Sequence, residues 1–233
     1  MHTMFYSVVR ALLRDELLST PTYDEGKAKM LIKLLDRADM IEEKFVTNGG
    51  GIDYTDRSAK GLGKRTLLQE AANESVRLQQ ELEYEQEGEK RLRLQQELEA
   101  QYVLAQRLCE LGADPAASVV NTLHQKDEMP VHLAVWPGNE KMFGMLFSFW
   151  LMNDENREQF VAAFSQEQNG DFNGFLHAPK LWCCPQRGDI KRGDPIAKII
   201  SEARKGLQRG DPIEKIILKA RKETEPRCRC AIM

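Results

Sequence analysis

The residues best suited to covalent chemistry are the cysteines near the carboxyl end of the chain. Cys230 is followed by two aliphatic residues, Ala231 and Ile232, and by the terminal Met233. This arrangement is the C-a-a-X signal for prenylation, and a terminal Met favours a farnesyl group. The sequence therefore predicts that a eukaryotic prenyltransferase attaches farnesyl to the Cys230 sulfur, after which the last three residues are removed.

A second membrane signal is expected beside this cysteine, because one lipid chain gives only marginal and reversible membrane binding. Cys228 is a candidate palmitoylation site two residues upstream. Basic side chains near an anionic leaflet contribute about 1 kcal/mol each. The predicted membrane-facing basic residues are Lys215, Lys219, Arg221, Lys222, Arg227 and Arg229. Together these features predict a lipid anchor at the cytoplasmic face of a eukaryotic membrane.

Composition agrees with a globular body carrying a basic end. The 233 residues are 42% hydrophobic and 30% charged, with a net charge of −3. From Lys180 onward, however, 14 Lys and Arg residues stand against 7 Asp and Glu residues. A basic end on an acidic body suits an anionic membrane surface. Because no aromatic stacking or base-reading motif accompanies these charges, nucleic acid is not an expected partner.

The cysteine count and the hydropathy pattern limit the class of protein. Five cysteines, two pairs of which are close in sequence, do not form a disulfide framework and fit a reducing compartment. No apolar run reaches the roughly 18 residues of a membrane span, and no signal peptide begins the chain. Membrane contact is therefore expected through the C-terminal end of the chain, including the lipidation tail at 227–233, and not through a spanning helix.

Enzyme chemistry is not predicted. The sequence has four histidines and no phosphate loop, nucleophile elbow or nucleophile–base pattern. Cys183 and Cys184 with His177 lack the spacing of a zinc site, so palmitoylation of the pair is favoured over metal binding. We expect no cofactor, no metal and no catalytic residue, with an enzyme of unfamiliar motif as the alternative.

Residues 1–48 are expected to form a helical hairpin. Apolar residues at helical spacing predict helices over 4–18 and about 23–45, separated by Pro21 and followed by a glycine run at 49–51. The expected inner faces carry Phe5, Val8, Val9, Leu12, Leu13 and Leu17 on the first helix, and Met30, Leu31, Leu34, Leu35 and Met40 on the second.

Residues 49–182 carry four short motifs. Two of them are typical of the start of a helix, Gly63–Ala72 and Met129–Ala134, and a weaker helix start is Asn173–Ala178. The fourth, Leu108–Pro115, is typical of a helix end followed by a Gly-Ala-Asp turn. These motifs resemble those of the ankyrin repeat. The resemblance implies paired helices in a stack, with His132 and His177 in structural positions and one face free for a protein partner.

The spacing departs from that family. The openings at Thr66, Met129 and Phe175 are 63 and 46 residues apart, whereas an ankyrin repeat has about 33. The chain is therefore expected to be a degenerate stack with a charged helical insertion at 73–108. The alternative is another all-helical domain in which these matches arose by chance. The aromatic side chains of 139–182 are expected in the core, with a recognition surface as the alternative.

The insertion contains an internal repeat. Arg77–Glu83 returns as Arg93–Glu99, and Glu87–Arg91 and Glu89–Arg93 are expected ion pairs at i,i+4 spacing. The period of 16 does not keep a heptad phase. We expect a long helix or a pair kinked at Gly88, either a solvated charged helix or a partner-binding or self-associating coiled-coil arm.

Residues 183–226 contain a second tandem repeat. Arg192–Lys205 returns as Arg209–Lys222, and each copy opens with Asp-Pro, which favours a helix start. Each copy predicts a short basic amphipathic helix with an Ile-rich face. That face either caps the helical stack or lies on the membrane. The Arg-Gly-Asp tripeptides could also suggest integrin binding, which a cytosolic lipidated protein would not use.

The resulting expectation is an all-α protein, a helical repeat stack tethered to membrane and acting as an adaptor for a protein partner. Ankyrin-like repeats joined to a C-a-a-X end resemble translocated effectors of intracellular bacteria such as Legionella, which are secreted and then prenylated in the host cell. The alternatives are a helical oligomerising scaffold that never touches membrane, and an enzyme.

Overall fold

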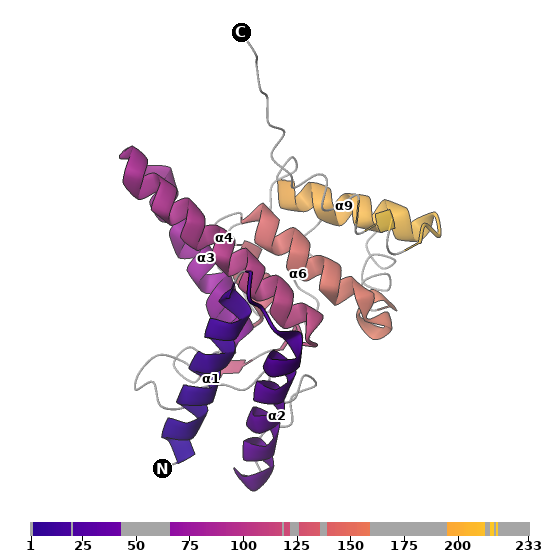
Figure 1. Ribbon diagram of the computed structural model, residues 1–233. Helices are drawn as coiled ribbons and strands as arrows, with labels where there is room; N and C mark the ends of the chain where they lie inside the picture. Colours follow the sequence, from indigo (N-terminus) through magenta and orange to yellow (C-terminus); the bar gives the residue numbers. More distant parts are fainter. Residues whose placement is uncertain are drawn as a thin grey trace.

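The computed structural model describes residues 2–19, 21–42, 66–117, 119–121, 126–135, 139–158, 195–212, 215, 216 and 218. The chain is mostly helical, which confirms the all-α prediction. The elements are α1 (His2–Leu18), α2 (Glu25–Glu42), α3 (Leu67–Tyr84), α4 (Gly88–Glu110), β1 (Val119–Asn121), β2 (Lys126–Glu128), α5 (Pro130–Val135), α6 (Glu140–Met152) and α9 (Pro195–Gln208) (Figure 1). The two short strands pair antiparallel.

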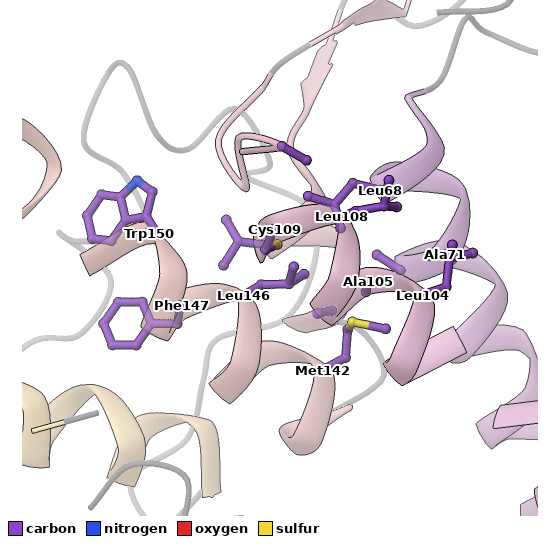
Figure 2. Packing of buried hydrophobic residues seen from close by; sticks show 14 of the residues in the cluster. Leu68, Ala71, Leu104, Ala105, Leu108, Cys109, Met142, Leu146, Phe147 and Trp150 are labelled. Carbon is purple, nitrogen blue, oxygen red and sulfur yellow. The ribbon is translucent and has the colours of Figure 1, made fainter. Parts of the chain in front are cut away.

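The helices pack in series along one core. α1 packs against α2 and α4, α4 against α3 and α6, α5 against α3 and α6, and α9 against α6. One cluster of buried apolar side chains runs from Val9 on α1 to Ile216 beyond α9. Figure 2 shows its centre, where side chains of α3, α4 and α6 converge. Phe147 stacks between Phe143 and Trp150, so these aromatic residues lie in the core as predicted.

The N-terminal hairpin forms, but its apolar faces are narrower than the sequence predicts. α1 ends at Leu18, before Pro21, and Leu13, Leu17, Leu31 and Leu35 are buried. The prediction was wrong for four residues that are exposed: Val8, Leu12, Met30 and Leu34. The buried stripe of α2 instead includes Ala28. A small residue there lets the two helices approach closely, so their contact leaves the flanking apolar side chains outside.

A charged side chain of α4 holds the end of α1. Arg107 donates hydrogen bonds to the carbonyl oxygens of Leu17 and Ser19, and its guanidinium lies 4.1 Å from the Tyr23 ring centroid. Cations are favourable at a helix C-terminus because the last carbonyls there lack partners. Nearby, Lys27 pairs with the Glu16 carboxylate and lowers its pKa. The hairpin is therefore fastened to the body by polar contacts as well as by its apolar stripe.

The internal repeat of 73–108 forms the two arms of an antiparallel helical hairpin. α3 begins with a capping box, in which Gln69 N donates to Thr66 Oγ1 (3.1 Å) and Thr66 N donates to Gln69 Oε1 (2.8 Å). Gly88 is the first residue of α4, so it begins a helix and does not kink one. The 63-residue gap between the predicted openings is largely taken up by the length of these two helices.

The leucines of the repeat explain its period. Leu78 and Leu94 occupy equivalent positions in the two copies, lie equally far from Gln86 in the connecting turn, and are both buried. In an antiparallel hairpin such positions fall at the same level. One of the two predicted ion pairs forms, Arg93 with Glu89 at 2.5 Å. Arg91 instead donates to the backbone carbonyl of Glu85, at 3.2 Å.

A buried carboxamide joins this hairpin to α6. Asn139, fully buried, is the N-cap of α6, and its Oδ1 accepts from Met142 N (3.1 Å) and from the Tyr102 hydroxyl (3.0 Å). Its Nδ2 donates to Ser75 Oγ at 3.0 Å. Burial raises the pKa of Tyr102 to about 12, so its hydroxyl keeps its proton and remains a donor. One side chain thus fixes α6 against both α3 and α4.

Asn139→Ala should lower the free energy of unfolding by about 3 kcal/mol, because it removes a helix cap and leaves Tyr102 and Ser75 without this partner. Urea denaturation measures the loss. The matched control is Asn153→Ala: Asn153 is exposed and caps only the following turn, through Asn156 N at 3.2 Å. That change should cost about 1 kcal/mol or less. Equal losses for the two variants would contradict the central role of Asn139.

Candidate functional site

The described part of the predicted membrane site is α9 together with the turn that follows it. Apolar residues recur along α9 at i, i+3, i+4 and i+7, and all four are buried: Ile196, Ile199, Ile200 and Ala203. α9 packs against α6, and Figure 1 shows it at the opposite end of the molecule from α1 and α2. The Ile-rich face of the first copy was predicted either to cap the helical stack or to lie on the membrane. In the structure this face packs against the helical body.

The opposite side of α9 is basic and faces outward. Lys198 and Lys205 are exposed, and Lys205 also pairs with Glu202 at 3.1 Å. Because the apolar stripe is used for packing, the lysines remain on the outer surface. Membrane contact by this helix would therefore be electrostatic, and insertion of its apolar face is not available in this arrangement.

The turn after α9 is tightly specified. Gly210 has a positive φ of 69°, Gly210 N donates to Leu207 O (3.0 Å) and Asp211 N donates to Gly206 O (2.9 Å). This is a Schellman-type helix end, which requires the left-handed conformation that glycine adopts without strain. The second Arg-Gly-Asp tripeptide is thus part of a helix end.

The charges of that tripeptide are engaged with each other. The Asp211 carboxylate accepts from Arg209 at 2.8 Å and from Lys215 Nζ at 3.2 Å, and these two cations lower the pKa of Asp211. Paired in this way, Arg209 and Asp211 are not presented as separate charges. The geometry agrees with setting aside the integrin interpretation of this copy.

The second copy of the repeat folds back on the first. Ile216 is 4% exposed, and an added Cβ at Gly206 would lie 2.6 Å from its Cγ1. Gly206 therefore provides the space in which Ile216 packs. Of the other residues described here, Lys215 is exposed and Leu218 is 54% exposed.

Of the residues predicted for the lipid site, the structure describes Lys215. The others lie outside the described residues: Lys219, Arg221, Lys222, Arg227, Cys228, Arg229, Cys230, Ala231, Ile232 and Met233. His124, His177, Cys183 and Cys184 also lie outside them, and His132 is on α5. The described cysteine, Cys109, is buried and forms no disulfide with another described residue.

Within the described ranges, no cluster of His, Cys, Asp and Glu is placed to hold a metal ion, and no helix is long and apolar enough to cross a membrane. Comparison with protein-family models, with curated proteins and with solved structures finds no match to this chain.

One feature was missed by sequence reasoning, a pocket of about 300 Å³ between α1, α3 and α4. Gln101, one of its lining residues, is 7% exposed. A signal for it exists in the sequence: on α4 the buried or partly buried positions recur at Leu94, Leu98, Gln101, Ala105 and Leu108. A glutamine in an otherwise apolar helical stripe marks a polar group carried into the interior.

Gly206→Ala should destabilise the protein by about 1–3 kcal/mol, because the new methyl group overlaps Ile216 in a packed contact. Gly206→Ala combined with Ile216→Ala should recover part of that loss, since the second change vacates the space. Gly88→Ala is the control: nothing lies within 4 Å of a Cβ there. Hydrogen exchange of residues 209–218 measures the local effect, and unchanged exchange in Gly206→Ala would contradict the described packing.

Proposed function

We propose that this protein is a membrane-tethered adaptor. Its anchor is farnesyl on Cys230, with Cys228 as a second lipid site, and its helical body holds a protein partner at the cytoplasmic face of a eukaryotic membrane. The C-a-a-X end of the sequence supports the proposed farnesylation of Cys230. The observation that carries the proposal is the orientation of α9, which buries its isoleucines against α6 and leaves its lysines outward. In the sequence, α9 precedes the cysteines of the proposed anchor.

Stable membrane binding needs both the lipid and the basic side chains. A single lipid chain holds a protein only marginally, whereas each basic residue near an anionic leaflet adds about 1 kcal/mol. Lys198, Lys205 and Lys215 are exposed. Lys205 and Lys215 also pair with Glu202 and Asp211, so their contributions are partly offset. The exposed lysines still strengthen the binding of a farnesylated chain to an anionic surface, while a neutral membrane gains only the lipid term.

The helical body is proposed to be a degenerate ankyrin-like stack. Support comes from the order of its elements, in which a helix pair (α3, α4) is followed by a β-hairpin and then by a second helix pair (α5, α6). The Gly-Ala-Asp turn closes α4 with a left-handed Gly112 (φ 99°) and a bond from Ala113 N to Leu108 O at 2.9 Å. Gln69 Nε2 approaches Ala117 O at 3.5 Å, which links the opening of one pair to the turn before the next hairpin.

The biological setting that we propose is a host cell. Prenylation requires eukaryotic enzymes, and the combination of a divergent helical body with a C-a-a-X end resembles secreted effectors of intracellular bacteria. In that setting the protein is made in the bacterium, folds without its lipid, and acquires membrane affinity only after delivery. A helical scaffold that associates through α3 and α4 is the rival to this proposal.

A fluorescent protein fused to the N-terminus should be membrane-bound in a eukaryotic cell and diffuse when Cys230→Ser is introduced, because the serine hydroxyl does not accept the prenyl group. Met233→Ser is the matched control, because a terminal serine keeps a C-a-a-X end that accepts farnesyl, and it should leave the fusion at the membrane. Fluorescence microscopy with membrane fractionation measures the distribution. A diffuse wild-type fusion would contradict the proposal and favour the scaffold.

The farnesylated protein should lose affinity for anionic vesicles on Lys198→Gln, Lys205→Gln and Lys215→Gln by about 1 kcal/mol per site, or about fivefold in the partition coefficient. Binding to neutral vesicles should be unchanged. Lys33→Gln is the control, since Lys33 is exposed on α2 at the other end of the molecule (Figure 1). Vesicle co-sedimentation at two salt concentrations measures this, and an equal loss for Lys33→Gln would contradict the assigned orientation.

A further inference from the structure

The hairpin of α1 and α2 carries apolar side chains that the helical body does not cover. Val8 and Leu12 on α1 are 55% and 50% exposed, and Met30 and Leu34 on α2 are 56% and 37% exposed. Among the described residues eight large apolar side chains are exposed, and half of them lie on this hairpin. Single exposed apolar residues are ordinary, whereas a group of them marks an interaction surface.

The two exposed pairs run along the same seam between the helices. Lys27 on α2 forms an ion pair with Glu16 across the hairpin. On α1, Leu12 and Val8 lie one and two helical turns before Glu16, and on α2 the exposed pair lies about one and two turns after Lys27. Residues three or four apart on a helix share a face. The four side chains therefore flank one contact and form a single outer apolar face.

α2 is the helix that most needs a further neighbour. In the described part of the chain it packs mainly against α1, and Figure 1 shows it at the edge of the molecule. Ala28, Leu31 and Leu35 already bury one side of α2. A surface helix ordinarily has one apolar stripe, so the second stripe at Met30 and Leu34 is explained by another helix packed on it.

Two exposed charges complete the outer apolar face. Asp15 lies on α1 three residues after Leu12, and Lys33 lies on α2 between Met30 and Leu34. Neither charge has an ion pair among the described residues, whereas Lys27 and Lys29 on the same hairpin are both paired. The face thus presents an acid on one helix and a base on the other.

We propose that the outer apolar face binds the same face of a second copy of this chain, so that two hairpins form a four-helix bundle. A two-fold axis places the same patch of both copies in contact. α1 of one copy then lies against α2 of the other, the apolar stripes meet, and Asp15 of each copy meets Lys33 of the other.

Charge complementarity favours a second copy over a membrane as the occupant. An acid on α1 and a base on α2 are satisfied twice by a two-fold contact, and such complementarity selects a partner and fixes its orientation. An anionic leaflet would instead repel Asp15. This dimer goes beyond the adaptor function, and it forms through the end of the molecule opposite α9 (Figure 1), without the lipid.

Sedimentation velocity of the full chain without lipid tests the dimer. The mass should rise with concentration from 26.7 kDa toward twice that value. Leu12→Glu should weaken dimerisation at least about tenfold, because it places a carboxylate in the apolar contact of both copies. Leu92→Glu is the matched control: Leu92 is 54% exposed on α4, and its replacement should leave the dimer in place.

Charge reversal tests the orientation. Asp15→Lys and Lys33→Glu should each weaken the dimer at least about tenfold, because each creates a like-charge contact twice. The two changes together should restore it, since the pair is re-formed with its charges exchanged. Lys33→Gln introduces no repulsion, keeps the apolar contact and should remain dimeric. Far-UV circular dichroism should be unchanged throughout, because all the substituted side chains are exposed.

Four results would overturn the proposal. One is a monomer at every concentration up to about 1 mM, the range in which binding is negligible. A second is failure of the double reversal to restore the dimer. A third is loss of the dimer in Leu92→Glu and not in Leu12→Glu, which would place association on α3 and α4. The last is an unchanged mass in Leu12→Glu with weaker binding of the unlipidated chain to neutral vesicles, which would make a membrane the occupant. None of these results bears on farnesylation of Cys230, which is tested separately in cells.

Discussion

The buried carboxamide of Asn139 is the interaction on which the arrangement of helices depends. It caps α6, accepts from Tyr102 on α4 and donates to Ser75 on α3. Apolar packing specifies the register of helices less strictly than hydrogen bonds do, because the hydrophobic effect is non-directional. A buried amide whose partners sit on three different elements permits one register, since any shift leaves polar groups unpaired.

This constraint extends to the surface of the molecule through α6 and α9. With α6 fixed, its outer side provides the surface against which α9 buries its isoleucines. The basic side of α9 then faces outward, and Gly206 and Gly210 turn the second copy of the repeat back onto the first. The proposed membrane-facing surface thus follows from the packing of the core, and the lipid site lies farther along the same chain end.

Local signals in the sequence were sufficient for the helices and their ends, because these depend on nearby residues. Pro21, Gly112 and the Asp-Pro openings mark boundaries through backbone sterics, and the aromatic residues of α6 are buried by their own spacing. The faces of α1 and α2 were only half predicted, because what covers a helix is decided by its tertiary neighbours. Asn139 shows the same limit, because only the structure reveals that its buried amide has partners on α3, α4 and α6.

The most direct test of the account is the intact mass of the full chain purified from a eukaryotic cell. The account predicts a mass that lacks Ala231, Ile232 and Met233 and includes one farnesyl group, with fragmentation placing the lipid on Cys230. A mass equal to that of the unmodified chain would contradict the proposed anchor. In that case α9 would be a cap of the helical body without a role at a membrane.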